Sequence, residues 1–176
     1  MGSIVTRMKT SAWVAVGLVP LLGPLPLGAA VAPIPDVPKI APIPHRKIAV
    51  EETAREVKIE LPGDVLFDFD KWDLRPDAEA TLQQVAEIIQ RYPKAMITIA
   101  GYTDAKGADT YNLQLSERRA KSVKAWLVQQ GGVDGKQMTT KGWGEAKPVA
   151  PNTHPDGSDN PEGRQQNRRV ELTVKK

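Results

Sequence analysis

The sequence contains no cysteine and few aromatic residues, and both shortages restrict what the protein can be. With no cysteine among its 176 residues, the chain can form neither disulfide bonds nor thiolate metal sites. Aromatic residues make up only 5% of the chain, so Val, Ile, Leu and Ala must fill most of any core. No basic stripe with interleaved aromatics occurs, and 24 basic residues are nearly balanced by 21 acidic ones. This pattern argues against nucleic-acid binding.

The first 53 residues differ in composition from the rest of the chain. Residues 1–32 carry Arg7 and Lys9 before an apolar run and end in small residues, which is typical of a signal peptide. An uncleaved membrane anchor is the alternative, although the run is short and interrupted by prolines. Residues 33–53 begin with prolines that alternate with Ile and Val, which favours an extended linker. Composition alone leaves open whether this linker is a spacer, a remnant tail or a docking segment.

Residues 54–176 have the periodicity of a folded domain. Runs of β-branched or alternating apolar residues predict four strands, and helical spacing predicts two helices. The predicted strands cover residues 57–61, 96–100, 138–144 and 169–174, and the predicted helices cover residues 76–92 and 111–131. This β-α-β-α-β-β order predicts an α/β (α+β) two-layer sandwich, with a mixed four-stranded sheet and helices packed on one face. Residues 148–166, rich in Pro, Gly, Asn and Asp, are predicted to form an exposed loop.

A charged pair stands out where the second predicted strand leads into the long helix. Gly101 ends the strand, and a turn-rich loop carrying Asp104 follows it. In the helix, Arg119 interrupts the apolar face to which Leu115 and Val123 belong. Burial of an unpaired guanidinium is unfavourable, so Arg119 requires an anion. The spacing alone leaves two candidates, which are Asp104 in an internal ion pair and the carboxylate of a ligand.

The residues around this pair resemble the signature of the OmpA-like domain family. The matching positions are Gly101, Tyr102, Thr103, Asp104, Gly107, Tyr111, Asn112, Leu115, Ser116, Arg119 and Ala120. Two outlying segments agree as well, because Leu66–Asp70 resembles the end of the family's first strand and Asn167–Glu171 resembles its last strand. The resemblance therefore covers most of the predicted folded domain.

This resemblance implies non-covalent binding of peptidoglycan through the diaminopimelate of the stem peptide. The side chain of diaminopimelate ends in an ammonium and a carboxylate on one carbon. The resemblance implies that Asp104 accepts hydrogen bonds from the ammonium and that Arg119 binds the carboxylate bidentately. It further implies that Asp70, Thr103, Asn112 and Leu115 line the pocket and that Arg168 holds Asp104 from behind.

The same resemblance implies a place in the bacterial envelope for a protein without enzymatic activity, cofactor or metal. We expect it in the periplasm, associated with the cell wall and the outer membrane, where it would help to stabilise the envelope. The lack of cysteine departs from the lipoprotein branch of the family, which needs a lipid-modified cysteine. Peptidoglycan is the expected partner, and the proline-rich linker is the candidate contact for outer-membrane or other envelope proteins.

Three other functions compete with this interpretation. A periplasmic protein-interaction module would work through the linker, with wall contact incidental. A glycan hydrolase needs a proton donor and a nucleophile, but no acid is marked for either role and both histidines lie outside the expected pocket. A metal site at Asp64, Asp68, Asp70 and Asp73 would lack the central glycine and the ligand spacing of a calcium loop. Peptidoglycan binding is therefore the function that the residues favour.

Overall fold

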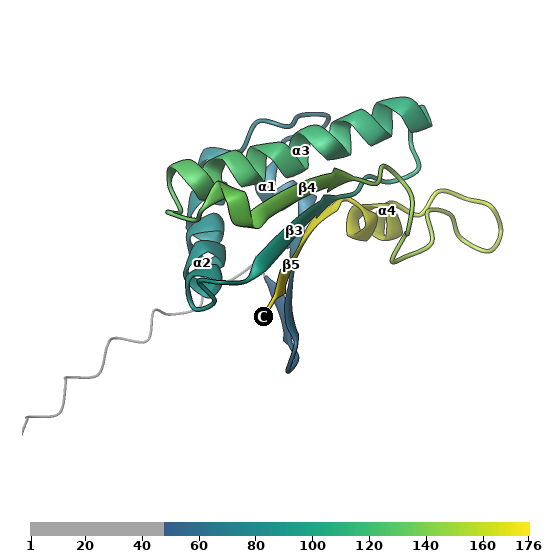
Figure 1. The fold of residues 1–176 in the computed structure, drawn as a ribbon. Coiled ribbons are helices and arrows are strands. Elements are labelled where there is room, and N and C mark those ends of the chain that lie inside the picture. The colour runs from purple at the N-terminus through teal and green to yellow at the C-terminus, as the bar shows by residue number, and fades with distance from the viewer. Residues whose placement is uncertain (1–47) are drawn as a thin grey trace, which may run out of the picture. The chain divides into compact units, whose positions relative to one another are not determined.

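The computed structural model describes residues 48–176 (Figure 1). The predicted signal peptide (residues 1–32) and most of the predicted linker (residues 33–53) lie outside the described residues. In chain order the elements are β1 (Ala49–Glu52), β2 (Glu56–Pro62), α1 (Gly63–Leu66), the 3₁₀ turn η1 (Pro76–Ala78), α2 (Glu79–Gln90), β3 (Met96–Gly101), α3 (Asp109–Gln129), the 3₁₀ turn η2 (Gly135–Gln137), β4 (Met138–Gly142), α4 (Pro161–Asn167) and β5 (Arg169–Lys175).

The strands form one mixed sheet in the order β1-β2-β5-β3-β4. The pairs β1 with β2, β2 with β5 and β5 with β3 are antiparallel, whereas β3 and β4 are parallel. A parallel pair needs a crossover connection, and α3 supplies it. Strand β5, the last in the chain, therefore lies at the centre of the sheet between β2 and β3.

Alternation along the strands decides which face of the sheet is buried. Ile59 of β2 and Ile99 of β3 both lie opposite Leu172 of β5, and all three are fully buried. Helices α2 and α3 cover this face with Leu82, Val85, Ala86, Ile89, Ala120, Val123 and Leu127. Figure 1 shows α3 running across the sheet above β3 and β4. The predicted two-layer α/β class with helices on one face is thus confirmed.

Strand β1 is not predicted by the sequence pattern, so the sheet has five strands rather than four. Its residues fall in the range assigned to the linker, and all four are exposed. Backbone pairing with β2, rather than an apolar face, holds the strand. Glu52 adds side-chain contacts, because its Oε1 accepts hydrogen bonds from Tyr92 Oη (2.7 Å) and Lys176 Nζ (2.5 Å). Such a strand leaves no alternating pattern to read.

Two glycines let α3 approach the sheet closely. Gly101 of β3 and Gly142 of β4 are partners in the parallel register. A Cβ atom at Gly101 would lie 2.1 Å from the carbonyl oxygen of Ser116, and one at Gly142 would lie 2.6 Å from the amide nitrogen of Glu117. Only glycine leaves room for the helix backbone at this point. The contact sets the height of α3 above the strand ends. It therefore also sets the position of Arg119, which lies in the same turn of the helix.

The segment predicted as a long loop, residues 148–166, contains the start of a short helix. Helix α4 begins at Pro161, and Asn160 caps it by accepting a hydrogen bond from the amide of Gly163 (3.0 Å). Asn160, Pro161 and Glu162 form a helix-start signal, but the surrounding turn residues obscure it. Among residues 48–176, no helix combines the length and the apolar character that crossing a membrane requires.

Candidate functional site

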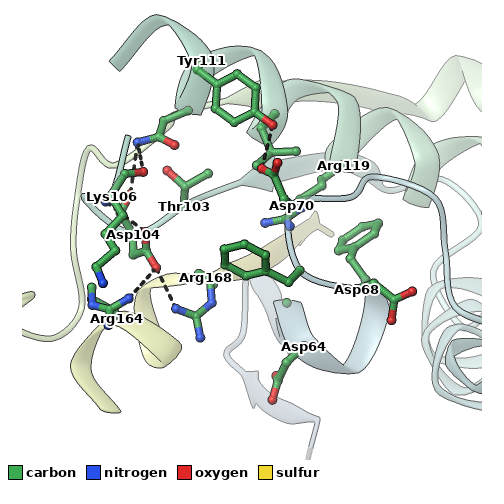
Figure 2. A pocket seen from close by; sticks show the side chains of 15 residues that line it. Asp64, Asp68, Asp70, Thr103, Asp104, Lys106, Tyr111, Arg119, Arg164 and Arg168 are labelled. Carbon is green, nitrogen blue, oxygen red and sulfur yellow. Dashed lines mark hydrogen bonds and ion pairs between the residues drawn. The ribbon is translucent and has the colours of Figure 1, made fainter. Parts of the chain in front are cut away.

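A pocket of about 190 Å³ lies beside the loop after β3, the first turns of α3 and the segment after α1 (Figure 2). Its lining residues are Gly63, Asp64, Phe67, Asp68, Phe69, Asp70, Thr103, Asp104, Lys106, Tyr111, Asn112, Leu115, Arg119, Arg164 and Arg168. All the site residues predicted from the sequence are in this set. The fold therefore brings together residues from four separate parts of the chain.

Asp104 is held from both sides. The residue is only 7% exposed. Oδ1 accepts a hydrogen bond from the amide of Lys106 (3.0 Å), which tightens the loop. Oδ2 accepts a hydrogen bond from Arg168 Nη1 (2.7 Å) and lies 3.5 Å from Arg164 Nη1. The carboxylate is therefore fixed in the pocket wall, and its strongest ionic contact is with Arg168.

Arg119 brings a buried positive charge into the pocket. It is 5% exposed and lies two turns after Tyr111 on α3. Its Nε donates to the carbonyl of Lys71 (2.9 Å), and its guanidinium lies 5.1 Å from the centre of the Phe67 ring. Within residues 48–176, no ion pair joins Arg119 to a carboxylate, so the internal pair with Asp104 is absent from this part of the chain.

Nearby carboxylates balance only a part of the cost of burying the positive charge of Arg119. Burial is the main effect that lowers the pKa of Arg119, and the nearby guanidinium of Arg168 lowers it further. The Asp70 and Asp104 carboxylates and the Tyr111 side chain act in the opposite direction but do not outweigh burial. A second anion at this guanidinium would favour its charged form. A carboxylate bound in the pocket would supply such an anion.

Thr103 contributes a hydroxyl with no hydrogen-bond partner among the described residues. The residue is 5% exposed, and its Oγ1 is the sole buried side-chain oxygen or nitrogen in residues 48–176 that lacks a partner. Its amide donates to the carbonyl of Gly144 (2.8 Å), so the backbone is fixed. Leaving a buried hydroxyl unpaired costs roughly 1–3 kcal/mol. A polar ligand atom at this position would remove that penalty.

Asn112 and Leu115 shape the pocket rather than charge it. Asn112 Nδ2 donates to the carbonyls of Asp104 (3.3 Å) and Lys106 (3.1 Å) and to Glu145 Oε2 (3.0 Å). This nitrogen is therefore engaged with the loop that carries Asp104. Leu115, which is nearly fully buried, adds an apolar surface one turn before Arg119.

Asp70 stands on the other side of the pocket. Its backbone is left-handed, with φ at 60°, a conformation that aspartate tolerates better than most residues. Its Oδ1 accepts a hydrogen bond from Tyr111 Oη (2.6 Å). Figure 2 shows Asp104, Arg164 and Arg168 together on one side and Asp70 with Tyr111 on the other.

Several lining residues were not predicted from the sequence. Arg164 lies in the segment predicted as a loop, although the helix-start signal at residues 160–162 puts it on a helix, α4, which ends just before Arg168. Phe67 reads as an ordinary core residue, and it is buried, but its ring also lies beneath the Arg119 guanidinium. Tyr111 matches the family signature without any role attached to it. Phe67 and Tyr111 contact partners distant in sequence, which a local pattern does not reveal. Arg164 donates hydrogen bonds to nearby Asp159 (2.9 and 2.6 Å) and also reaches the distant Asp104.

The structure is a small α/β domain with a pocket lined by charged residues, and the comparisons show the family to which this domain belongs. The chain belongs to the OmpA family, whose model matches residues 66–162. The domains of this family are non-enzymatic, typically bind peptidoglycan and are linked to the cell envelope. The predicted family and the absence of enzymatic activity are therefore confirmed.

Two relatives and one solved structure illustrate the similarity. The chain is 50% identical over 119 residues to photosystem I P700 chlorophyll a apoprotein A2 of Gloeobacter violaceus, a match that covers 68% of this chain and 14% of that protein. It is 37% identical over 102 residues to the peptidoglycan-associated lipoprotein of Rhizobium meliloti, covering 58% of this chain and 57% of that protein. The chain thus spans less than two thirds of both relatives.

The solved structure is the cell wall anchor of the T6SS from Pseudomonas aeruginosa. It matches with a TM-score of 0.63 and 30% identity, covering 73% of this chain and 87% of that chain. The name of this anchor refers to the cell wall, and the name of the Rhizobium lipoprotein refers to peptidoglycan.

Proposed function

We propose that this domain binds uncrosslinked peptidoglycan non-covalently, through the zwitterionic end of diaminopimelate in the stem peptide. Family membership supports peptidoglycan as the ligand. The observation that carries the finer proposal is Arg119, a guanidinium that is 5% exposed and has no ion-pair partner within residues 48–176. A buried cation beside buried and exposed carboxylates suits a ligand that presents both charges on one carbon.

Arg119 would bind the carboxylate of the ligand. Its Nε is engaged by the Lys71 carbonyl, which leaves the two terminal nitrogens for a ligand. Those nitrogens match the two oxygens of a carboxylate in a bidentate pair. The Phe67 ring beneath the guanidinium limits the other orientations that the group could take.

Asp104 would accept hydrogen bonds from the ammonium, with Thr103 completing the contacts. The Oδ atoms of Asp104 each carry more than one acceptor position, so the contacts with Arg168 and Lys106 do not exhaust them. The hydroxyl of Thr103 can donate to the carboxylate or accept from the ammonium. Asp70, Asn112 and Leu115 would complete the lining, with Arg168 supporting Asp104.

A single stem peptide should bind this small pocket weakly. Each charge-assisted hydrogen bond contributes roughly 1.5–3 kcal/mol, and the loss of freedom on association offsets a part. The wall repeats the same ligand many times, which favours rebinding. Because its homologues are outer-membrane or periplasmic envelope proteins, we also propose that the protein lies in the periplasm, associated with the cell wall and the outer membrane, where it would help to hold the envelope together.

Sedimentation of the full chain with purified sacculi tests this proposal. Replacing Arg119 with Lys keeps the charge but removes the planar fork, and replacing Asp104 with Asn keeps the shape but removes the charge. We expect each variant to lose about tenfold or more in affinity, because at least one charge-assisted hydrogen bond is lost. The bound fraction as a function of sacculus concentration measures the effect.

Arg91→Ala provides a matched control, because Arg91 is an exposed arginine at the end of α2, outside the pocket. It should sediment like the wild type. Thermal unfolding of each variant checks that the fold is intact. Wild-type binding by folded Arg119→Lys and Asp104→Asn variants would disprove the diaminopimelate pocket.

A further inference from the structure

One wall of the pocket is an exposed segment that α3 fastens in place. Residues 68–73 are all exposed and follow the single turn of α1. Three side chains of α3 reach consecutive positions in this segment. The contacts are Tyr111 Oη to Asp70 Oδ1 (2.6 Å), Arg119 Nε to the Lys71 carbonyl (2.9 Å) and the Arg118 guanidinium over the Trp72 ring (4.5 Å).

The contact between Tyr111 and Asp70 differs from the other two because both of its residues line the pocket. Tyr111, Leu115 and Arg119 are spaced four residues apart, so they share one stripe of α3 that faces the pocket. Figure 2 shows the phenol of Tyr111 reaching the carboxylate of Asp70. The hydrogen bond therefore connects the helix that carries Arg119 to the opposite wall.

Two acids, Asp70 and Asp104, flank the proposed ligand position, and Asp70 has fewer contacts with positively charged groups. Asp104 contacts the guanidinium groups of Arg164 and Arg168. Within residues 48–176, by contrast, Asp70 forms no ion pair, and the Tyr111 hydroxyl is its one hydrogen-bond donor. Arg119 acts on Asp70 only from beyond ion-pair distance. An ammonium near both acids would therefore gain more from Asp70, the carboxylate with no ion pair in this part of the chain.

We propose that Tyr111 is a positioning residue that holds the Asp70 carboxylate toward the pocket, where it receives the ammonium of the diaminopimelate together with Asp104. This inference rests on the proposed function. Asp70 lies in an exposed segment, and the Tyr111 hydroxyl is the one hydrogen-bond donor to its side chain within residues 48–176, so this contact fixes the direction of the carboxylate. The hydrogen bond to Asp70 raises the pKa of Tyr111, which keeps the phenol protonated and able to donate.

Two synthetic peptides separate this role from a general effect on the fold. The first is L-alanyl-γ-D-glutamyl-meso-diaminopimelate. In the second, 2-aminopimelate replaces diaminopimelate, so the distal carboxylate remains but the distal ammonium is missing. The affinity of the full chain for each peptide is measured by calorimetry, for the wild type and for Tyr111→Phe. We expect Tyr111→Phe to bind the first peptide about tenfold more weakly and the second as well as the wild type does.

Tyr92→Phe is the matched control, because Tyr92 also donates to an exposed carboxylate, Glu52 (2.7 Å), but lies outside the pocket. It should bind both peptides like the wild type. Equal affinity of Tyr111→Phe and wild type for the first peptide would overturn the inference. So would an equal loss for both peptides, which would mark a role in the fold of the wall. Failure of the wild type to bind the first peptide would instead refute the proposed function.

Discussion

Thr103 carries a hydroxyl that finds no partner in the part of the chain that the structure describes. Such a group lowers the stability of the folded state, because it gives up water on folding and receives no hydrogen bond in return. Valine has nearly the same shape and lacks the hydroxyl. The side chain of Thr140, by comparison, has a partner, since its Oγ1 donates to Glu117 Oε1 (3.3 Å).

We expect Thr103→Val to be more stable than the wild type by about 1 kcal/mol and to bind sacculi several-fold more weakly. Thr140→Val should instead lose stability and keep its binding. Chemical denaturation gives the free energy of unfolding of each variant, and sedimentation gives the binding. A Thr103→Val variant that binds as tightly as the wild type would show that the hydroxyl does not touch the ligand.

The sequence predicts some pocket residues and misses others for a physical reason. Arg119 is visible because a charge on an apolar helix face violates the local pattern, and Asp104 is visible because it matches the family signature at the end of a predicted strand. Tyr111 and Arg164 violate nothing, since a tyrosine or an arginine in a polar helix segment is ordinary. Their roles come from contacts with Asp70 and Asp104 across the fold. Only the folded chain brings those partners together.

At the scale of the element, the placement of α3 depends on the paired glycines of β3 and β4. A methyl group at Gly101 would meet the backbone of α3 at 2.1 Å, and backbone atoms cannot rotate away as the end of a side chain can. The helix must then rise from the sheet or the strand must bend. Either change displaces Arg119 from the pocket floor.

We expect Gly101→Ala to lose about 3 kcal/mol of unfolding free energy, near the upper limit for overpacking, and to lose sacculus binding as well. Gly135→Ala is the control, because the nearest atom to its added methyl group is the end of the Val128 side chain at 3.3 Å. Denaturant titration of both variants measures the difference. Near-wild-type stability of Gly101→Ala would mean that α3 does not need this close approach.

The elements that the sequence fails to predict share one property. Strand β1 is exposed along its whole length, and α4 is a short helix within a turn-rich segment. Neither buries a long apolar face, so hydrophobic periodicity carries no signal for them. Polar contacts hold both, through Glu52 in β1 and through Asn167, which accepts hydrogen bonds from the amides of Val149 and Ala150. The core strands and the two long helices, by contrast, are predicted by the periodicity of their hydrophobic residues.

At the scale of the whole molecule, the face of the sheet away from the helices carries a charge conflict. Glu60 of β2 lies directly opposite Glu171 of β5. Arg169 compensates Glu171, because its Nε donates to Glu171 Oε1 (2.7 Å). Burial, followed by the charges of Glu171 and Glu51, raises the pKa of Glu60 above its ordinary value of 4.5, against the effect of Arg169.

A raised pKa in the folded state means that ionisation of Glu60 destabilises the fold. Stability should therefore fall as the pH rises from the ordinary carboxyl value through the raised one, and it should recover on acidification through that window. We expect Glu60→Gln to be more stable than the wild type at pH 7, with the difference shrinking toward pH 4. Glu171→Gln, which loses the ion pair with Arg169, should be less stable at pH 7. Thermal unfolding across this pH range would contradict the assignment if Glu60→Gln showed no gain.

The hydrogen bond that fixes Arg119 to the Lys71 carbonyl has a stereochemical consequence. With its guanidinium plane held before any ligand arrives, the pocket presents three separate points, namely the arginine fork for a carboxylate, the acid for an ammonium and the apolar side chain of Leu115 for the carbon chain. Three attachment points, unlike two, distinguish an object from its mirror image. Such a surface would bind one enantiomer of an α-amino acid end group and exclude the other. The chirality of the wall peptide would then itself be a recognition signal.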